Sequence, residues 1–123
     1  MFFVLYVLHD DEKLKAVLDA WQHSGVSGVT ILPSTGIGRI HDHFALREDV
    51  PLIPSLKSLL EEHEDLLNRT LFTVVDDEAM VDRVVAATEK VVGRLDSPNT
   101  GILVVLPVIR AYGLHRDKNG STL

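Results

Sequence analysis

Four short apolar runs along the chain have the composition of β-strands. They cover residues 2–8, 29–32, 71–75 and 102–109. Within each run apolar residues follow one another without the alternation of a strand that has one wet face, so we expect both faces of the sheet to be covered. Pro33 indicates that the second run ends at a sheet edge or leaves the sheet there, and Pro107 interrupts the last run.

Two amphipathic helices are predicted between these strands. The apolar face of the first consists of Leu14, Val17, Leu18 and Trp21. The apolar face of the second consists of Met80, Val81, Val84, Val85, Thr88, Val91 and Val92. The expected N-caps are Asp10 or Asp11 for the first helix and Asp76 or Asp77 for the second, and the expected stops are Gly25 and Gly93.

The stretch between the second and third strands changes character along its length. Residues 34–49 contain turn-forming residues and little periodicity, which predicts a loop. After Pro51 and Pro54, leucines recur at helical spacing within a polar segment, at Leu56, Leu59, Leu60, Leu66 and Leu67. We therefore expect an extra helix inserted in this loop. Residues 115–123 form a polar tail that we expect to be flexible.

This order of elements predicts an α+β fold, a ferredoxin-like βαββαβ sandwich with an inserted helix between strands two and three. A four-stranded antiparallel sheet would carry both helices on one face, within a single domain of residues 1–114. The other face would be bare although its strands are apolar on both sides, so we expect copies of the chain to associate through it. Burying even ~500 Å² of such surface is worth roughly 12 kcal/mol before the costs of association.

Composition narrows the classes of function. Hydrophobic residues make up 46% of the 123-residue chain and charged residues only 24%, which also suits a protein with subunit interfaces. The formal net charge of -6 argues against a nucleic-acid surface, which needs clustered lysine and arginine. The chain contains no cysteine. This excludes disulfides, thiolate metal sites and cysteine nucleophiles. Residues 2–8 lack the basic flank of a signal peptide and the length of a membrane span, and we expect a cytoplasmic protein.

No arrangement of residues demands catalysis, so we do not expect an enzyme. The carboxylates within residues 61–65 are typical of a solvated helix face, and no nucleophile elbow is present. A metal site is one alternative, since His41 and His43 on an extended segment would point to the same side, with His63 as a third ligand for Zn or Ni. Solvated loop histidines are the simpler interpretation.

Several short motifs resemble those of the PII signalling proteins, the nitrogen regulatory protein P-II family. Residues 74–78 (VVDDE), followed by a valine-rich helix, are similar to the junction of the third strand and second helix in that family. Residues 35–39 (TGIGR) look like the start of its long regulatory T-loop, with Ile37 in place of the usual aromatic residue. A late Pro-Val pair and the order of elements also agree, and the resemblance runs over about residues 2–112.

The resemblance implies a homotrimer that binds an adenine nucleotide (ATP, ADP or AMP) or a similar anion between subunits. Residues 39–69 would then contact a regulated protein, such as a membrane transporter or an enzyme. The implied ligand residues are Thr35, Gly36, Gly38 and Arg39 on one side of the cleft and Asn99, Thr100 and Gly101 on the other, with Arg110 and Tyr112 reaching it from the last strand. Such residues suit an anion, because glycines let backbone N–H groups approach a phosphate and arginine makes two-pronged contacts.

The chain also departs from the pattern of that family. The second nucleotide-binding loop of PII proteins reads roughly Gly-Asp-Gly-Lys, whereas residues 98–101 read PNTG and contain no lysine. Between Lys90 and Arg110, Arg94 is the only basic residue, so a polyphosphate would meet less positive charge. The tyrosine that is modified in the T-loop of some members has no counterpart in residues 39–69. We therefore expect a divergent PII-like protein without classical nitrogen signalling.

Two other functions stay open at this point. The related CutA-like trimers, which are linked to divalent-metal tolerance, suggest a metal-binding trimer built on the three histidines named above. The third possibility is an assembly module that binds no ligand.

Overall fold

The structure is a computed structural model, and it describes residues 1–37 and 68–114. Its elements are β1 (Phe2–Leu8), the short 3-10 helix η1 (Asp11–Lys13), α1 (Leu14–Ser24), β2 (Thr30–Ser34), β3 (Asn68–Val75), α4 (Glu78–Val92) and β4 (Ile102–Pro107). This order confirms the predicted ferredoxin-like α+β fold. The predicted inserted helix and the polar tail lie outside the described residues.

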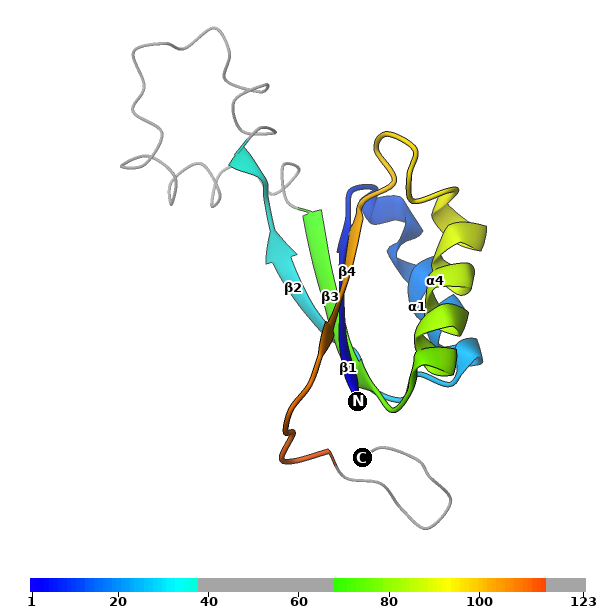
Figure 1. Ribbon diagram of the computed structural model, residues 1–123. Coiled ribbons are helices and arrows are strands. Elements are labelled where there is room, and N and C mark those ends of the chain that lie inside the picture. Colours follow the sequence, from blue (N-terminus) through cyan, green and yellow to red (C-terminus); the bar gives the residue numbers. More distant parts are fainter. Residues whose placement is uncertain (38–67, 115–123) are drawn as a thin grey trace, which may run out of the picture.

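The four strands form one antiparallel sheet in the order β2-β3-β1-β4 (Figure 1). The central strand β1 pairs with β3 on one side and β4 on the other, so β2 and β4 are the two edges of the described sheet. Pro33 lies in the edge strand β2, as predicted, although the strand continues to Ser34. Both long helices lie on the same face of the sheet, and α1 packs against α4.

The helices begin and end at the residues that local chemistry favours. The Asp10 carboxylate accepts a hydrogen bond from the N–H of Glu12 at 3.1 Å and starts η1. The Asp77 carboxylate accepts from the N–H of Met80 at 2.9 Å and caps α4. Gly25 ends α1 in the left-handed conformation, with φ of 108°. The cap of α4 and the stop of α1 are thus confirmed, whereas Asp10 caps the short helix that leads into α1, which itself begins after Lys13 without a side-chain cap.

The hydrophobic core lies between the sheet and the two helices. Its buried apolar residues are Val4, Tyr6, Leu8, Val17, Trp21, Val26, Leu71, Val75, Met80 and Val84. Within this core the Trp21 indole N–H donates to Thr88 Oγ1 at 2.8 Å, and the Thr88 hydroxyl donates to the Val84 carbonyl at 2.7 Å. This short chain of hydrogen bonds satisfies the buried polar groups and links α1 to α4.

The opposite face of the sheet is apolar, and no helix of the described residues lies over it (Figure 1). We call it the open face, and its apolar side chains are Phe3, Leu5, Val7, Leu32, Phe72, Val74, Ile102, Val104 and Leu106. Ile102 is 58% exposed and Leu106 is 52% exposed. The Phe3 and Phe72 rings contact each other across the strands, with their centroids 5.4 Å apart. The open face, which no described helix covers, is the apolar surface that the consecutive apolar residues predicted.

Replacing Thr88 by Val removes the acceptor of the buried Trp21 N–H while keeping the shape of the side chain. We expect the free energy of unfolding to fall by about 1–3 kcal/mol, because a buried donor would then lack a partner. Urea unfolding followed by circular dichroism at fixed protein concentration measures this change. Gln22→Ala on the exposed side of α1 is the control, with an expected change of no more than about 0.5 kcal/mol. Equal effects of the two substitutions would contradict a stabilising role for the buried bond.

Candidate functional site

The loop that joins α4 to β4, residues 93–101, is braced by hydrogen bonds from its own residues and from the helix. We call it the α4–β4 loop. The N–H of Leu95 donates to the Glu89 carboxylate at 3.0 Å, which ties the start of the loop to the helix. Near its end, the Thr100 hydroxyl donates to the Ser97 carbonyl at 2.8 Å. The predicted ligand residues 99–101 therefore lie in a loop of defined conformation.

Tyr6 of the central strand β1 is hydrogen-bonded to the backbone of this loop. Its hydroxyl donates to the carbonyl of Thr100 at 2.5 Å. Burial raises the pKa of Tyr6 to about 12, because the phenolate would lose its hydration, so the hydroxyl is a protonated donor at neutral pH. The hydrophobic pattern predicts only that Tyr6 lies within an apolar strand, since no local pattern indicates a partner 94 residues away.

Gly101 lies close to the Tyr6 ring, and there is no room at this position for a side chain. A β-carbon at this position would lie 2.7 Å from Tyr6 Cε1 and would collide with the Val7 carbonyl oxygen. Its φ of +97° is also a conformation that favours glycine. Asn99, two residues earlier, has a φ of +65°. The glycine that the sequence analysis assigned to a ligand site thus has a structural requirement of its own.

Thr35 and Gly36 lie at the same end of the sheet as the α4–β4 loop. They follow β2, whose last residue Ser34 pairs with Asn68, the first residue of β3. They are at the opposite edge, however, because β2 and β4 are the outer strands. Three strand spacings, about 14 Å, separate these edges. The two predicted halves of the cleft therefore share one end of the domain without meeting across it.

Arg110 and Tyr112 lie beyond the other end of the sheet. β4 ends at Pro107, which pairs with Phe2, and the main chain continues past Val108. The length of the central strand, roughly 20 Å, therefore separates them from the α4–β4 loop. Both side chains are exposed, Tyr112 by 86%. Arg110 can join the proposed site only if another copy of the chain supplies it.

The remaining predicted site residues lie outside the part of the chain that the structure describes. They are Gly38 and Arg39 of the proposed nucleotide cleft and His41, His43 and His63 of the proposed metal site. Among residues 1–37 and 68–114, no group of three or more histidine or acidic side chains has the arrangement of a metal site. β3 begins at Asn68, so residues 68 and 69 of the predicted 39–69 segment belong to the sheet.

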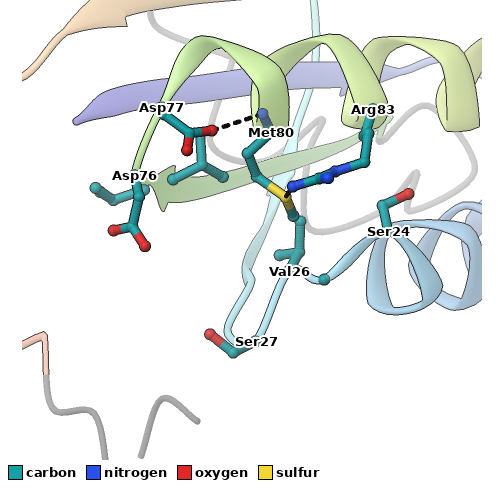
Figure 2. A pocket seen from close by; sticks show the side chains of 10 residues that line it. Ser24, Val26, Ser27, Asp76, Asp77, Met80 and Arg83 are labelled. Carbon is teal, nitrogen blue, oxygen red and sulfur yellow. Dashed lines mark hydrogen bonds between the residues drawn. The ribbon is translucent and has the colours of Figure 1, made fainter. Parts of the chain in front are cut away.

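A hollow that the sequence did not indicate lies at the end of the helix layer away from the α4–β4 loop. Figure 2 shows it between the turn after α1 and the junction of β3 with α4. Its volume is about 230 Å³. Arg83 Nη2 lies 3.3 Å from Met80 Sδ at this hollow. Asp77 lines it too, but its carboxylate caps α4. The acidic motif at this junction therefore has a structural role, as the capping analysis predicted.

Replacing Gly101 by Ala tests the close approach of the loop to Tyr6. We expect a loss of at least about 2 kcal/mol in the free energy of unfolding, because the new methyl group meets backbone and ring atoms in a strained conformation. Gly113→Ala is a matched control, since Gly113 has a φ of +93° but nothing within 4 Å of the added carbon, and about 1 kcal/mol is expected there. Urea unfolding compares the two. Similar losses would show that backbone conformation alone, not the contact, sets the cost at Gly101.

Comparison with known proteins gives one family. The family model described as Nitrogen regulatory protein P-II matches residues 4–118, which is most of the chain. No curated protein matches the chain. The match supports a regulatory protein and gives no support to the CutA-like alternative. No helix in the described part of the chain is long and apolar enough to cross a membrane. The chain belongs to the nitrogen regulatory protein P-II family.

Proposed function

We propose that this protein is a homotrimeric PII-like regulator that binds an adenine nucleotide or a similar anion in clefts between subunits. Residues 1–114 would form the regulatory domain, and residues 39–69 would carry the signal to a partner protein. The observation that carries this proposal is the family match over residues 4–118. Binding would favour one conformation of the 39–69 segment, and that conformation would be the signal.

The open face supports the association of several copies. Val104 of β4 pairs with Leu5 at the middle of the central strand, and together with Phe72 they form a continuous apolar patch. Such a surface costs free energy in water and gains it when a second apolar surface covers it. A copy of the same chain offers that surface. Association also brings the edges of different sheets together, which is where a cleft between subunits would form.

The positions of the predicted ligand residues also favour a site that spans subunits. Gly36 and the α4–β4 loop lie at opposite edges of one sheet, and Arg110 lies beyond its other end. No single copy gathers them within reach of one small ligand. A neighbouring copy can supply the missing group, so the trimer and the ligand site are parts of the same proposal.

The chemistry of the α4–β4 loop suits an anion bound chiefly by backbone N–H groups. The loop has no lysine, and the charge of its arginine is paired, since Arg94 Nη2 lies 2.9 Å from Asp96 Oδ2. Successive backbone N–H groups can form a concave anion site in a segment where some residues have φ above zero. Arg39, by the family resemblance, would add the cationic side chain.

Placing a charge on the open face tests the association. Val104→Glu should convert a species of three times the 13.6 kDa chain mass into monomers, because an unpaired carboxylate would be buried in the interface. Ala86→Glu on the exposed side of α4 is the control and should leave the mass unchanged. Light scattering after size-exclusion chromatography measures both. An unaltered protein that is a 13.6 kDa monomer at micromolar concentration would refute the trimer.

Thermal unfolding in the presence of candidate ligands tests the effector class. We expect ADP or ATP at 100 times its dissociation constant to raise the melting temperature by roughly 10 °C, since such a ligand stabilises the folded state by about 2.7 kcal/mol. Arg39→Ala should abolish the shift, and the double variant His41→Ala/His43→Ala should keep it. A shift with Zn or Ni alone that this double variant loses would favour the metal-binding trimer instead.

A further inference from the structure

The Tyr6 hydroxyl is a buried polar group that lies beside the proposed site. Its side chain is 0% exposed, and its ring packs in the core beside Trp21 with centroids 6.5 Å apart. A phenol in such a place needs an acceptor for its hydroxyl, because an unpaired buried donor is costly. The acceptor is the main-chain carbonyl of Thr100. The core of the domain is therefore connected by one hydrogen bond to the backbone of the α4–β4 loop.

This bond determines which way the next N–H group points. The peptide unit between Thr100 and Gly101 is planar and trans, so its carbonyl and its N–H point in opposite directions. With the Thr100 carbonyl directed at the Tyr6 hydroxyl, the Gly101 N–H is directed away from the Tyr6 hydroxyl. A reversed peptide would turn the N–H toward the hydroxyl and leave Tyr6 without its acceptor.

Two further contacts keep this peptide in place. The Thr100 hydroxyl donates to the Ser97 carbonyl, which closes the turn before it. Gly101 lies so close to the Tyr6 ring that an added β-carbon would overlap it. The phenol thus holds the peptide by its hydroxyl and supports it by its ring.

We propose that Tyr6 is a positioning residue of the anion site, because its hydrogen bond to Thr100 presents the Gly101 N–H to the phosphate groups of the ligand. This inference rests on the proposed function and names the residue that organises one wall of that cleft. In a loop without lysine, backbone donors account for a larger share of the attraction to an anion than they do in a loop that contains one. A donor that is already oriented binds more tightly than one that must be ordered when the ligand arrives.

The test is Tyr6→Phe, which removes the hydroxyl and keeps the ring under Gly101. We expect the dissociation constant for ADP, measured by titration calorimetry on the full-length protein, to rise about threefold to tenfold, the usual effect of one lost hydrogen bond. Hydrogen exchange of the backbone N–H groups in residues 97–101 should become faster. Thr88→Val is the control, because it removes another buried hydrogen bond, that between Trp21 and Thr88, in which no residue of this loop takes part, and it should leave the affinity for ADP unchanged.

The outcomes separate the two levels of the proposal. Binding of ADP by the unaltered protein with equal affinity in Tyr6→Phe would overturn the role of Tyr6 and leave the proposed function standing. An equal loss of affinity in Tyr6→Phe and Thr88→Val would also overturn it, since general stability would then explain the effect. Failure of the unaltered protein to bind any adenine nucleotide would refute the proposed effector and this inference with it.

Discussion

A sheet that is apolar on both faces, with helices over only one of them, is the constraint on which this protein depends. α1 and α4 cover the face that carries Val4 and Tyr6, and the buried Trp21 to Thr88 bond links the two helices. Nothing in the described chain gives the same cover to the open face. Because apolar area removed from water is the largest favourable contribution to folding and association, the second face accounts for the proposed trimer.

The candidate ligand site follows from the geometry of that sheet. Antiparallel pairing sends β2 and β4 to opposite edges, so the loops that follow β2 and precede β4 share an end but not a pocket. Under the proposed function, the site would depend on assembly for its closure and on Tyr6 for the shape of one wall. What the structure shows is that a single residue of the central strand connects the core to the α4–β4 loop, and under the proposal mutations in the core would affect the affinity of the site through it.

The hydrophobic pattern alone does not predict the ends of the strands correctly. β3 was expected to begin at residue 71, but it begins at Asn68. The residues added at its start are polar and carry no hydrophobic signal. They are in the sheet because β1 and β2 pair with them, and the Ser34 and Thr70 hydroxyls, 2.7 Å apart, form a hydrogen bond across the pair. β4, by contrast, ends at Pro107, the residue that interrupts its apolar run, and so is shorter than expected.

The sequence by itself determined the order of elements, the acidic pairs that supply the caps (Asp10 or Asp11, and Asp76 or Asp77), the stop at Gly25 and the apolar excess of the strands. These depend on spacing and on contacts within a few residues, which local chemistry specifies. Only the tertiary structure decided that Tyr6 bonds to Thr100, that Gly101 has no room for a side chain, and that Arg110 lies far from the α4–β4 loop. These facts join residues distant in the chain, and strand pairing, which no local pattern contains, brings them together or keeps them apart.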